Sequence, residues 1–159
     1  MSLYLQIPHV KGNVTTQGYQ NWIQLSSMNF TASRPVSQEV GRVRNRNLNH
    51  PNIQKIELSK PIDNASNALL ENLLKGSSLG TLHIHVCSTD KQLTPYLKYE
   101  LSDAMVTHYQ EMTGEEGFPH EQLTLSFTKL QRTHIPRNAA GQSQSPQTMG
   151  YTLETAQLS

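Results

Sequence analysis

Thr81-Leu-His-Ile-His-Val-Cys87 alternates apolar and polar side chains without interruption. The same alternation runs through Tyr96–Leu101 and through Gln122–Phe127. A period of two places successive side chains on opposite faces of an extended chain, so each stretch predicts a half-buried β-strand. The remaining residues must then supply more strands, cover an edge or close a barrel.

Further strands are predicted closer to the N-terminus. Leu3–Val10 carries its apolar residues on one face, and Ile53–Lys60 is a shorter segment of the same kind. Tyr19–Phe30 has apolar residues on both faces, which suits a strand lying between the core and another subunit. These segments are expected to extend the sheet.

One segment has the spacing of a helix. Ser66–Lys75 presents four leucines as an apolar stripe. Gly76 follows at the position after the helix, where a residue in the left-handed conformation commonly ends a helix. Asp63 or Ser66 is expected to cap the first turn. A helix of about three turns cannot form its own core, so we expect it to pack across the sheet or to plug an open barrel end.

The apolar–polar alternation changes phase twice, and it becomes weaker towards the C-terminus. Around Ser102–Asp103 the apolar positions change from odd to even numbers, and after Phe127 the next apolar residue is Leu130. Such slips predict β-bulges or bends. The segment 136–147 is expected to be flexible, and Tyr151–Leu153 is expected to add a last edge strand.

Composition narrows the class of protein. The 159 residues suffice for one domain, only 35% of them are hydrophobic, and the net charge of +1 argues against a general polyanion binder. Cys87 is the single cysteine, which excludes an internal disulfide and fits synthesis in a reducing cytoplasm. No signal peptide and no apolar run of membrane-spanning length is present, so neither the general secretory route nor membrane insertion is expected.

Periodicity disappears between residues 31 and 52, where the chain carries four arginines. A loop of this length in a compact domain is usually functional or disordered. Three interpretations remain open for this loop. It could contact an acidic neighbouring subunit, it could be a solvated flexible loop, or it could bind nucleic acid. The four arginines are Arg34, Arg42, Arg44 and Arg46.

Few residues suggest catalysis. On a strand, His83 and His85 share a face and could reach one metal ion. Zinc sites also need a third ligand and residues that orient the histidines, and no adjacent motif supplies them. Cys87 lies on the same face, yet nothing marks an activated thiolate. The remaining carboxylates fall at strand ends and in loops, where most are solvated. They are Glu100, Asp103, Glu115, Glu116 and Glu121. The residues by themselves predict no enzyme and no cofactor.

An ordered set of segments resembles one family along nearly the whole chain. The segments are Tyr4–Gly12, Trp22–Leu25, Gly41–Arg42, Lys60–Asp63, Ser66–Leu70, Tyr96–Val106, Glu121–Leu130 and Gly150–Leu153. In this order and spacing the chain is similar to the haemolysin co-regulated protein (Hcp) family, the tail-tube proteins of bacterial type VI secretion systems.

The resemblance implies a mainly β fold. Two antiparallel β-sheets would form a single barrel-like domain over residues 1–159, with one flanking α-helix at about 66–75 and an extended loop at about 31–52. It also implies homo-hexameric rings that stack into a tube inside a contractile sheath. Catalysis is not implied.

The resemblance further implies partners and sites. The tube would meet a spike protein, the sheath and the baseplate, and carry small secreted effectors in its lumen. It would be made in the bacterial cytoplasm and then secreted. Ser27 and Asn29 would face the lumen, and Arg34, Arg42, Arg44 and Arg46 become candidate contacts between subunits or rings. The alternatives are a metal-dependent β-barrel enzyme using His83 and His85, and a nucleic-acid-binding module using the basic loop.

Overall fold

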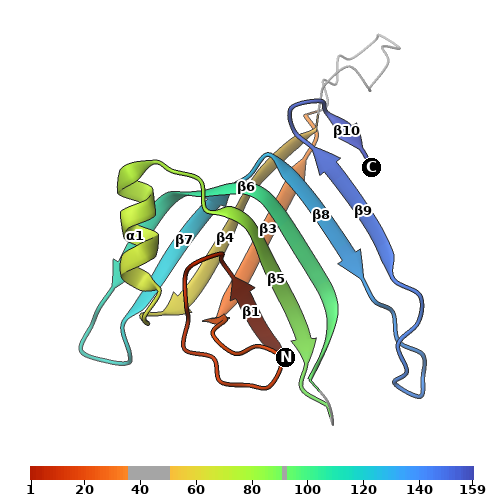
Figure 1. The fold of residues 1–159 in the computed structure, drawn as a ribbon, viewed down its shortest axis with the longest axis horizontal. Coiled ribbons are helices and arrows are strands. Elements are labelled where there is room, and N and C mark those ends of the chain that lie inside the picture. The colour runs from red at the N-terminus through yellow and green to blue at the C-terminus, as the bar shows by residue number, and fades with distance from the viewer. Residues whose placement is uncertain (36–50, 91–92) are drawn as a thin grey trace, which may run out of the picture.

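The chain folds into a large antiparallel sheet with one flanking helix (Figure 1). A computed structural model describes residues 1–35, 51–90 and 93–159. Their elements are β1 (Ser2–Gln6), β2 (Ile23–Leu25), β3 (Ser27–Ser33), β4 (Asn52–Pro61), α1 (Ser66–Lys75), β5 (Gly80–Ser88), β6 (Thr94–Met112), β7 (His120–Ser126), β8 (Lys129–His134), β9 (Gln147–Thr152) and β10 (Gln157–Leu158). The expected mainly β domain with a flanking helix is confirmed.

Strand β6 joins two parts of the sheet. Its first half pairs with β5 and β8, within the order β10-β9-β8-β6-β5-β1-β2. Its second half pairs with β7, which continues through β4 to β3. The alternating stretches Thr81–Cys87 and Tyr96–Leu101 lie in β5 and β6, and Gln122–Phe127 lies in β7 and the residue that follows it.

The predicted slips in the alternation occur where β6 changes partners. Asp103 has a φ of 54°, and the register with β5 shifts between Leu101 and Ala104. The second slip, after Phe127, separates β7 from β8. Both bends are confirmed, because each lets the chain leave one pairing and begin another.

The sheet has two arms, one from β6 through β5 and β1 to β2, and one from β6 through β7 and β4 to β3. The arms meet near Ser26, but strand pairing in the described part of the chain does not close them into a complete barrel. Among the described strands, no ladder joins β2 to β3 or β4. Ser26 alone separates β2 from β3, and its backbone N–H donates to the carbonyl of Ser59 at 2.7 Å. The barrel-like enclosure therefore depends on chain continuity at this point rather than on complete strand pairing.

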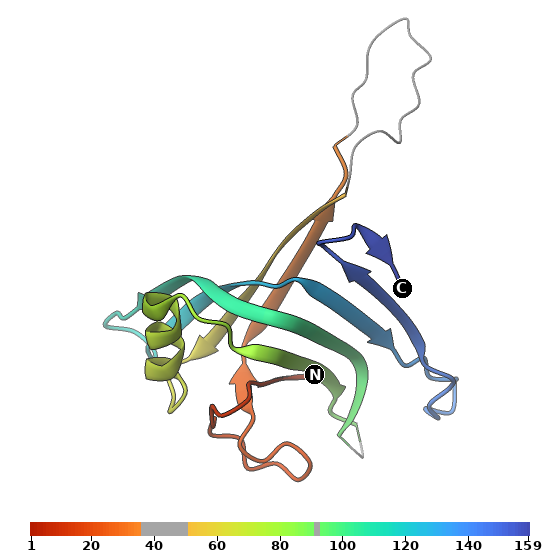
Figure 2. The same cartoon turned by 45° about the horizontal axis from the view of Figure 1, so that its top comes forward.

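The apolar faces of both arms share one core with the inner face of α1. Figure 2 shows α1 beside the β4–β7 end of the sheet, with β8 and β9 on the opposite side. Leu69 of the helix is fully buried. The fully buried members of the core are Leu5, Ile23, Ile56, Ala65, Leu69, Leu82, Ile84, Leu101 and Ala104. In the described part of the chain, no helix is long and apolar enough to cross a bilayer.

Helix α1 has the predicted bounds, and its C-terminal cap is also confirmed. Gly76 has a φ of 65°, and its N–H donates to the carbonyl of Asn72 at 2.9 Å. The prediction for the N-terminus is wrong, because the N-cap residue is Ala65 and no side chain caps it. Asp63 Oδ1 instead accepts from the Ala65 N–H at 2.9 Å, and Ser66 Oγ accepts from the Asp63 N–H at 2.9 Å.

Other boundaries differ from expectation. The strand expected over Tyr19–Phe30 begins only at Ile23, because residues 11–22 form a folded loop over the sheet. The loop expected at 31–52 is shorter, since β3 continues to Ser33 and β4 begins at Asn52. Most of that loop, with Arg42, Arg44 and Arg46, lies outside the described residues.

Candidate functional site

The face of β3, β4, β7 and β6 that points away from the core carries two rows of polar side chains. The strand register places Ser27, Ser59, Gln122 and Gln110 side by side in the first row. It places Asn29, Glu57, Thr124 and His108 side by side in the second. Within these polar rows, hydroxyl and amide groups predominate, and Glu57 is the one carboxylate. A surface of this kind can form hydrogen bonds over a wide area without a large apolar contact.

Two hollows flank the second row. One has a volume of about 170 Å³ and is lined by residues of both rows, among them Ser27 and His108. The other, of about 380 Å³, lies further along β3 and β4 and is lined by Thr31 and Lys55 among others. Asn29 and Glu57 belong to both linings. These two side chains therefore form the ridge between the hollows.

The candidate residues taken from the resemblance occupy two separate places. Ser27 and Asn29 are exposed on the same face of β3, one in each polar row. Arg34 is exposed just beyond the end of β3. The structure brings Ser27 and Asn29 together and leaves Arg34 apart from them. Whether any of these residues meets another subunit or a cargo stays a prediction.

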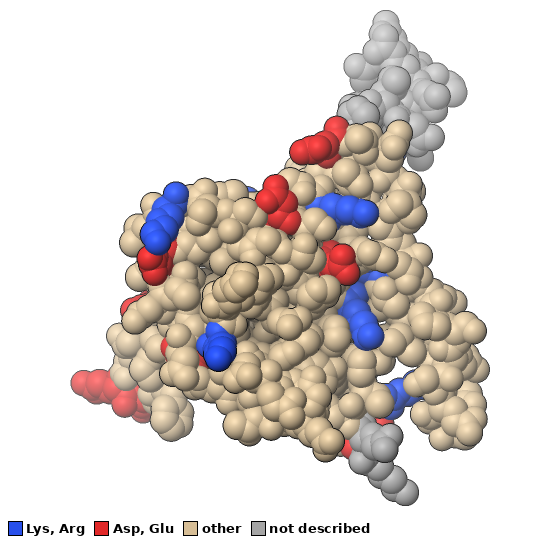
Figure 3. All heavy atoms as spheres, viewed as in Figure 1, with Lys and Arg blue, Asp and Glu red and all other residues tan. Residues whose placement is uncertain are grey.

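Charged side chains do not gather into a basic surface on the face seen in Figure 3. Lysine and arginine side chains there stand as separate patches among acidic ones and uncharged surface. Non-specific nucleic-acid binding depends on a continuous positive surface that neutralises several phosphates. This face of the described chain offers no such surface.

His85 and Cys87 lie in a small aromatic cluster on the face of β5 opposite the main core. The Tyr19 hydroxyl lies 3.0 Å from His85 Nδ1, and Cys87 Sγ donates to the same hydroxyl at 3.2 Å. The ring of Tyr19 stacks on Tyr4 at 4.6 Å and meets the edge of Trp22 at 4.8 Å. The folded loop 11–22 therefore covers this part of the strand.

The electrostatics of the cluster favour neutral groups. Burial raises the pKa of the Cys87 thiol. Burial also lowers the pKa of His85 to about 4, and the charges of Lys98 and His83 lower it further in the same direction. Burial also raises the pKa of Tyr19. A nucleophilic cysteine needs the opposite, a thiolate stabilised by positive charge. In the described residues, no three His, Cys, Asp or Glu side chains are grouped to hold a metal ion, so the histidine-metal alternative gains no support.

We expect Cys87 to be unreactive in the folded protein, because it is fully buried and its pKa is raised. Modification with a disulfide reagent at pH 8 should proceed at least about 100-fold more slowly in the native protein than in urea. Absorbance of the released chromophore measures both rates. Equal rates in the two conditions would show that the cluster opens readily.

One carboxylate predicted to be solvated is buried instead. Glu121 is fully buried, and its Oε1 forms an ion pair with Lys60, which is also fully buried. Lys60 Nζ donates further to Asp63 Oδ1 at 2.8 Å and to Ser66 Oγ at 3.3 Å. The interpretation of Glu121 as a surface carboxylate is wrong. Through these contacts, the residues at the start of α1 bind to Lys60 of β4 and Glu121 of β7.

The second oxygen of Glu121 extends the network to β6. Tyr109 donates its hydroxyl hydrogen bond to Glu121 Oε2 at 2.6 Å, and its oxygen also lies 2.7 Å from Glu111 Oε1. Burial, the bonds to Glu121 and Glu111 and their negative charges all raise the pKa of the Tyr109 phenol. Glu115 and Glu116 are exposed in the β6–β7 turn, as predicted. Asp103 is exposed and Glu100 is partly exposed, but both lie within β6 rather than at a strand end or in a loop.

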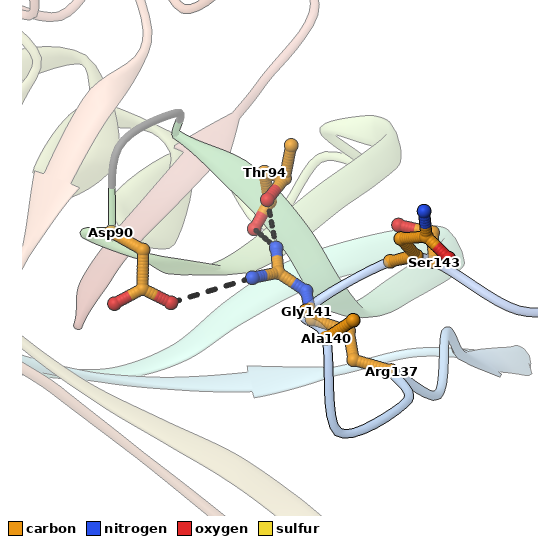
Figure 4. A pocket seen from close by; sticks show the side chains of 7 residues that line it. Asp90, Thr94, Arg137, Ala140, Gly141 and Ser143 are labelled. Carbon is orange, nitrogen blue, oxygen red and sulfur yellow. Dashed lines mark hydrogen bonds and ion pairs between the residues drawn. The ribbon is translucent and has the colours of Figure 1, made fainter.

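A wide pocket lies between the β5–β6 turn and the segment after β8 (Figure 4). Arg137 crosses it, donating to Ser88 Oγ at 2.9 Å, bonding Thr94 and lying 3.5 Å from Asp90 Oδ2. The guanidinium is thus already engaged by the protein. Its contacts tie the segment around 137–143 to the β5–β6 turn and present no nucleophile or acid–base pair.

A family model decides which family this fold and these surfaces belong to. The model described as "Type VI secretion system effector, Hcp" matches residues 4–134. The chain belongs to the Hcp family. Hcp proteins are structural, secreted tube proteins of the type VI secretion system and are not known as enzymes.

Solved structures share the Hcp fold at low sequence identity. A type six secretion system protein is 20% identical, with 99% of each chain covered and a TM-score of 0.92. Hcp1 from Salmonella typhimurium is 18% identical, covering 99% of this chain and 98% of that one, with a TM-score of 0.82. A type VI secretion system effector from Yersinia pestis is 19% identical, covering 94% and 98%, with a TM-score of 0.74. No curated protein matches the chain.

The buried network of this Hcp chain had a signal in the sequence. Glu121 lies two and four positions before Leu123 and Leu125, and Lys60 lies two positions after Leu58. Residues separated by an even number of positions share one face of a strand. Alternation therefore places both charged residues on the core face, where a charge must find a partner. The missing piece was the register, which sets Lys60 directly opposite Glu121.

Proposed function

We propose that this Hcp chain forms homo-hexameric rings that stack into the inner tube of a type VI secretion system. The observation that carries the proposal is the exposed pair of polar rows, which contains Ser27 and Asn29 on an otherwise well-packed sheet. In a ring, this face lines the lumen. Small hydroxyl and amide groups there let a protein cargo pass and bind it reversibly.

Free strand edges support association into a ring. In the described part of the chain, β3 pairs on one side alone and β10 ends the other arm of the sheet. Edge strands with unpaired backbone groups are prone to pair with other chains unless they are covered. Rotation about a ring axis brings one patch of each subunit against a different patch of the next, so every edge is covered in the closed assembly.

The two ends of the molecule support stacking of rings. The register of β4 with β7 places the β6–β7 turn, residues 113–119, at the end of the sheet opposite Ser33 and Asn52, where β3 ends and β4 begins. The ten residues of β4 separate these ends by about 33 Å. Arg34, Arg42, Arg44 and Arg46 contact acidic groups of the neighbouring ring or subunit in this proposal. An arginine fork can bind a carboxylate through two parallel hydrogen bonds.

The mechanism is mechanical rather than catalytic. Chains made in the bacterial cytoplasm assemble inside the sheath on the baseplate, with a spike protein at the tip of the tube. Contraction of the sheath then expels the tube with small effectors in its lumen. The work comes from the sheath, so the tube needs many individually weak contacts that hold during expulsion and separate afterwards.

We expect light scattering at low salt to give six times the 17.9 kDa mass of one chain, and electron microscopy to show rings with an open pore. Stacks of rings should shorten as salt rises from about 0.05 to 1 M, because exposed ion pairs are screened. Particles of single-chain mass at every protein concentration would contradict the ring. Stacks whose length does not change with salt would contradict the arginine contacts alone.

A further inference from the structure

The second polar row contains a carboxylate with no partner. Glu57 is exposed near the middle of β4, and in the described part of the chain its carboxylate forms no hydrogen bond and no ion pair. Its neighbours in the row are Asn29 on β3 and Thr124 on β7, both uncharged. The charge of Glu57 is therefore free to meet a ligand.

The surroundings of Glu57 favour a directional contact. It forms the ridge between the two hollows with Asn29, whose side-chain oxygen is a second acceptor. The other titratable groups facing this area are Lys55, two residues along β4, and His108, two strands away at about 10 Å. Lys55 makes no ion pair with Glu57 in the structure. The strand backbone holds the acceptors in fixed positions.

We propose that Glu57 selects cargo that presents arginine side chains to the polar rows. A guanidinium carries five N–H donors in a planar fork, which matches a carboxylate and leaves donors for an adjacent amide oxygen. An apolar ligand would leave this carboxylate without a partner, and an acidic one would be repelled by it. The ligand is therefore a basic, arginine-bearing segment of a cargo protein.

The inference rests on the proposed ring, because the ring repeats Glu57 around one lumen. A cargo with several arginines then meets several carboxylates at once, and the second contact forms at high effective concentration. A single exposed pair contributes little, so binding depends on this repetition. Weak individual contacts also allow release when the ring comes apart.

Calorimetric titration with a tetra-arginine peptide amide at low ionic strength tests the inference. We expect the native protein to bind it, and Glu57→Gln to weaken binding about fivefold or more. Glu57→Lys should abolish binding of the basic peptide and create binding of a tetra-glutamate peptide. Glu154→Gln, which removes an exposed carboxylate after β9, is the matched control and should leave the affinity unchanged.

Several results would overturn the inference. They are absence of peptide binding to the native protein, unchanged affinity in Glu57→Gln, and an equal loss in Glu154→Gln. Tighter binding of tetra-glutamate to the native protein would assign the site to Lys55 instead. Light scattering on the same samples separates this inference from the proposed function. Intact rings whose peptide binding does not depend on Glu57 refute the cargo preference and leave the ring standing. Single chains in the scattering experiment refute the ring, and Glu57-dependent binding to them refutes the dependence on repetition as well.

Discussion

Replacement of Glu121 by alanine should lower the free energy of unfolding by about 3 kcal/mol. The substitution leaves Lys60 fully buried with Asp63 as its remaining carboxylate, and removes an acceptor from Ser66 and Tyr109. A buried charge that loses its partner keeps its desolvation cost without the compensating attraction. Urea denaturation followed by circular dichroism measures the loss.

Two further variants sharpen this prediction. Glu116→Ala removes an exposed carboxylate from the β6–β7 turn and should change the stability by less than about 0.5 kcal/mol. The double variant Lys60→Met with Glu121→Leu removes both charges together, and it should be more stable than Glu121→Ala alone. A cost below about 1 kcal/mol for Glu121→Ala would show that water reaches the network.

The second large effect is expected at Gly12. An added Cβ there would lie 2.6 Å from the carbonyl carbon of Trp22 and 2.7 Å from the Cα of Ile23, and both atoms belong to the backbone. The N–H of Gly12 also donates to the carbonyl of Asn21 at 2.8 Å. Gly12→Ala must therefore displace the loop 11–22, at a cost of about 3 kcal/mol.

Trp22 reports on this displacement, because it is the single tryptophan of the chain and its ring packs against Tyr19 and His85. We expect Gly12→Ala to shift its emission to longer wavelength before the main unfolding transition. Gly114→Ala is the matched control, since a Cβ at Gly114 meets no atom within 4 Å. Native-like emission and stability in Gly12→Ala would contradict the close approach.

The local pattern of the sequence predicted the strands that carry the core. Alternation in Thr81–Cys87, and its slip near Asp103, identified β5 and the bend of β6, because each depends on residues close together in the chain. The helix over Ser66–Lys75 followed from its leucine stripe for the same reason. Short-range periodicity is a reliable guide where one face is buried and the other is not.

Features set by register were not predictable in this way. The Lys60–Glu121 pair joins residues far apart in sequence, and the cluster of Tyr19 with His85 and Cys87 depends on a loop folding over the sheet. In the candidate site, Ser27 and Asn29 came from the family resemblance and not from periodicity. Glu57 was not identified at all, because its place between two uncharged neighbours appears only when β3, β4 and β7 are aligned.

Cryo-electron microscopy of the purified protein can show both the ring and the orientation of its subunits. We expect a closed ring of six chains whose channel wall carries the polar rows, with Ser27, Asn29 and Glu57 of every subunit facing the lumen. Single chains, or a ring that turns these residues outward or buries them between subunits, would contradict it.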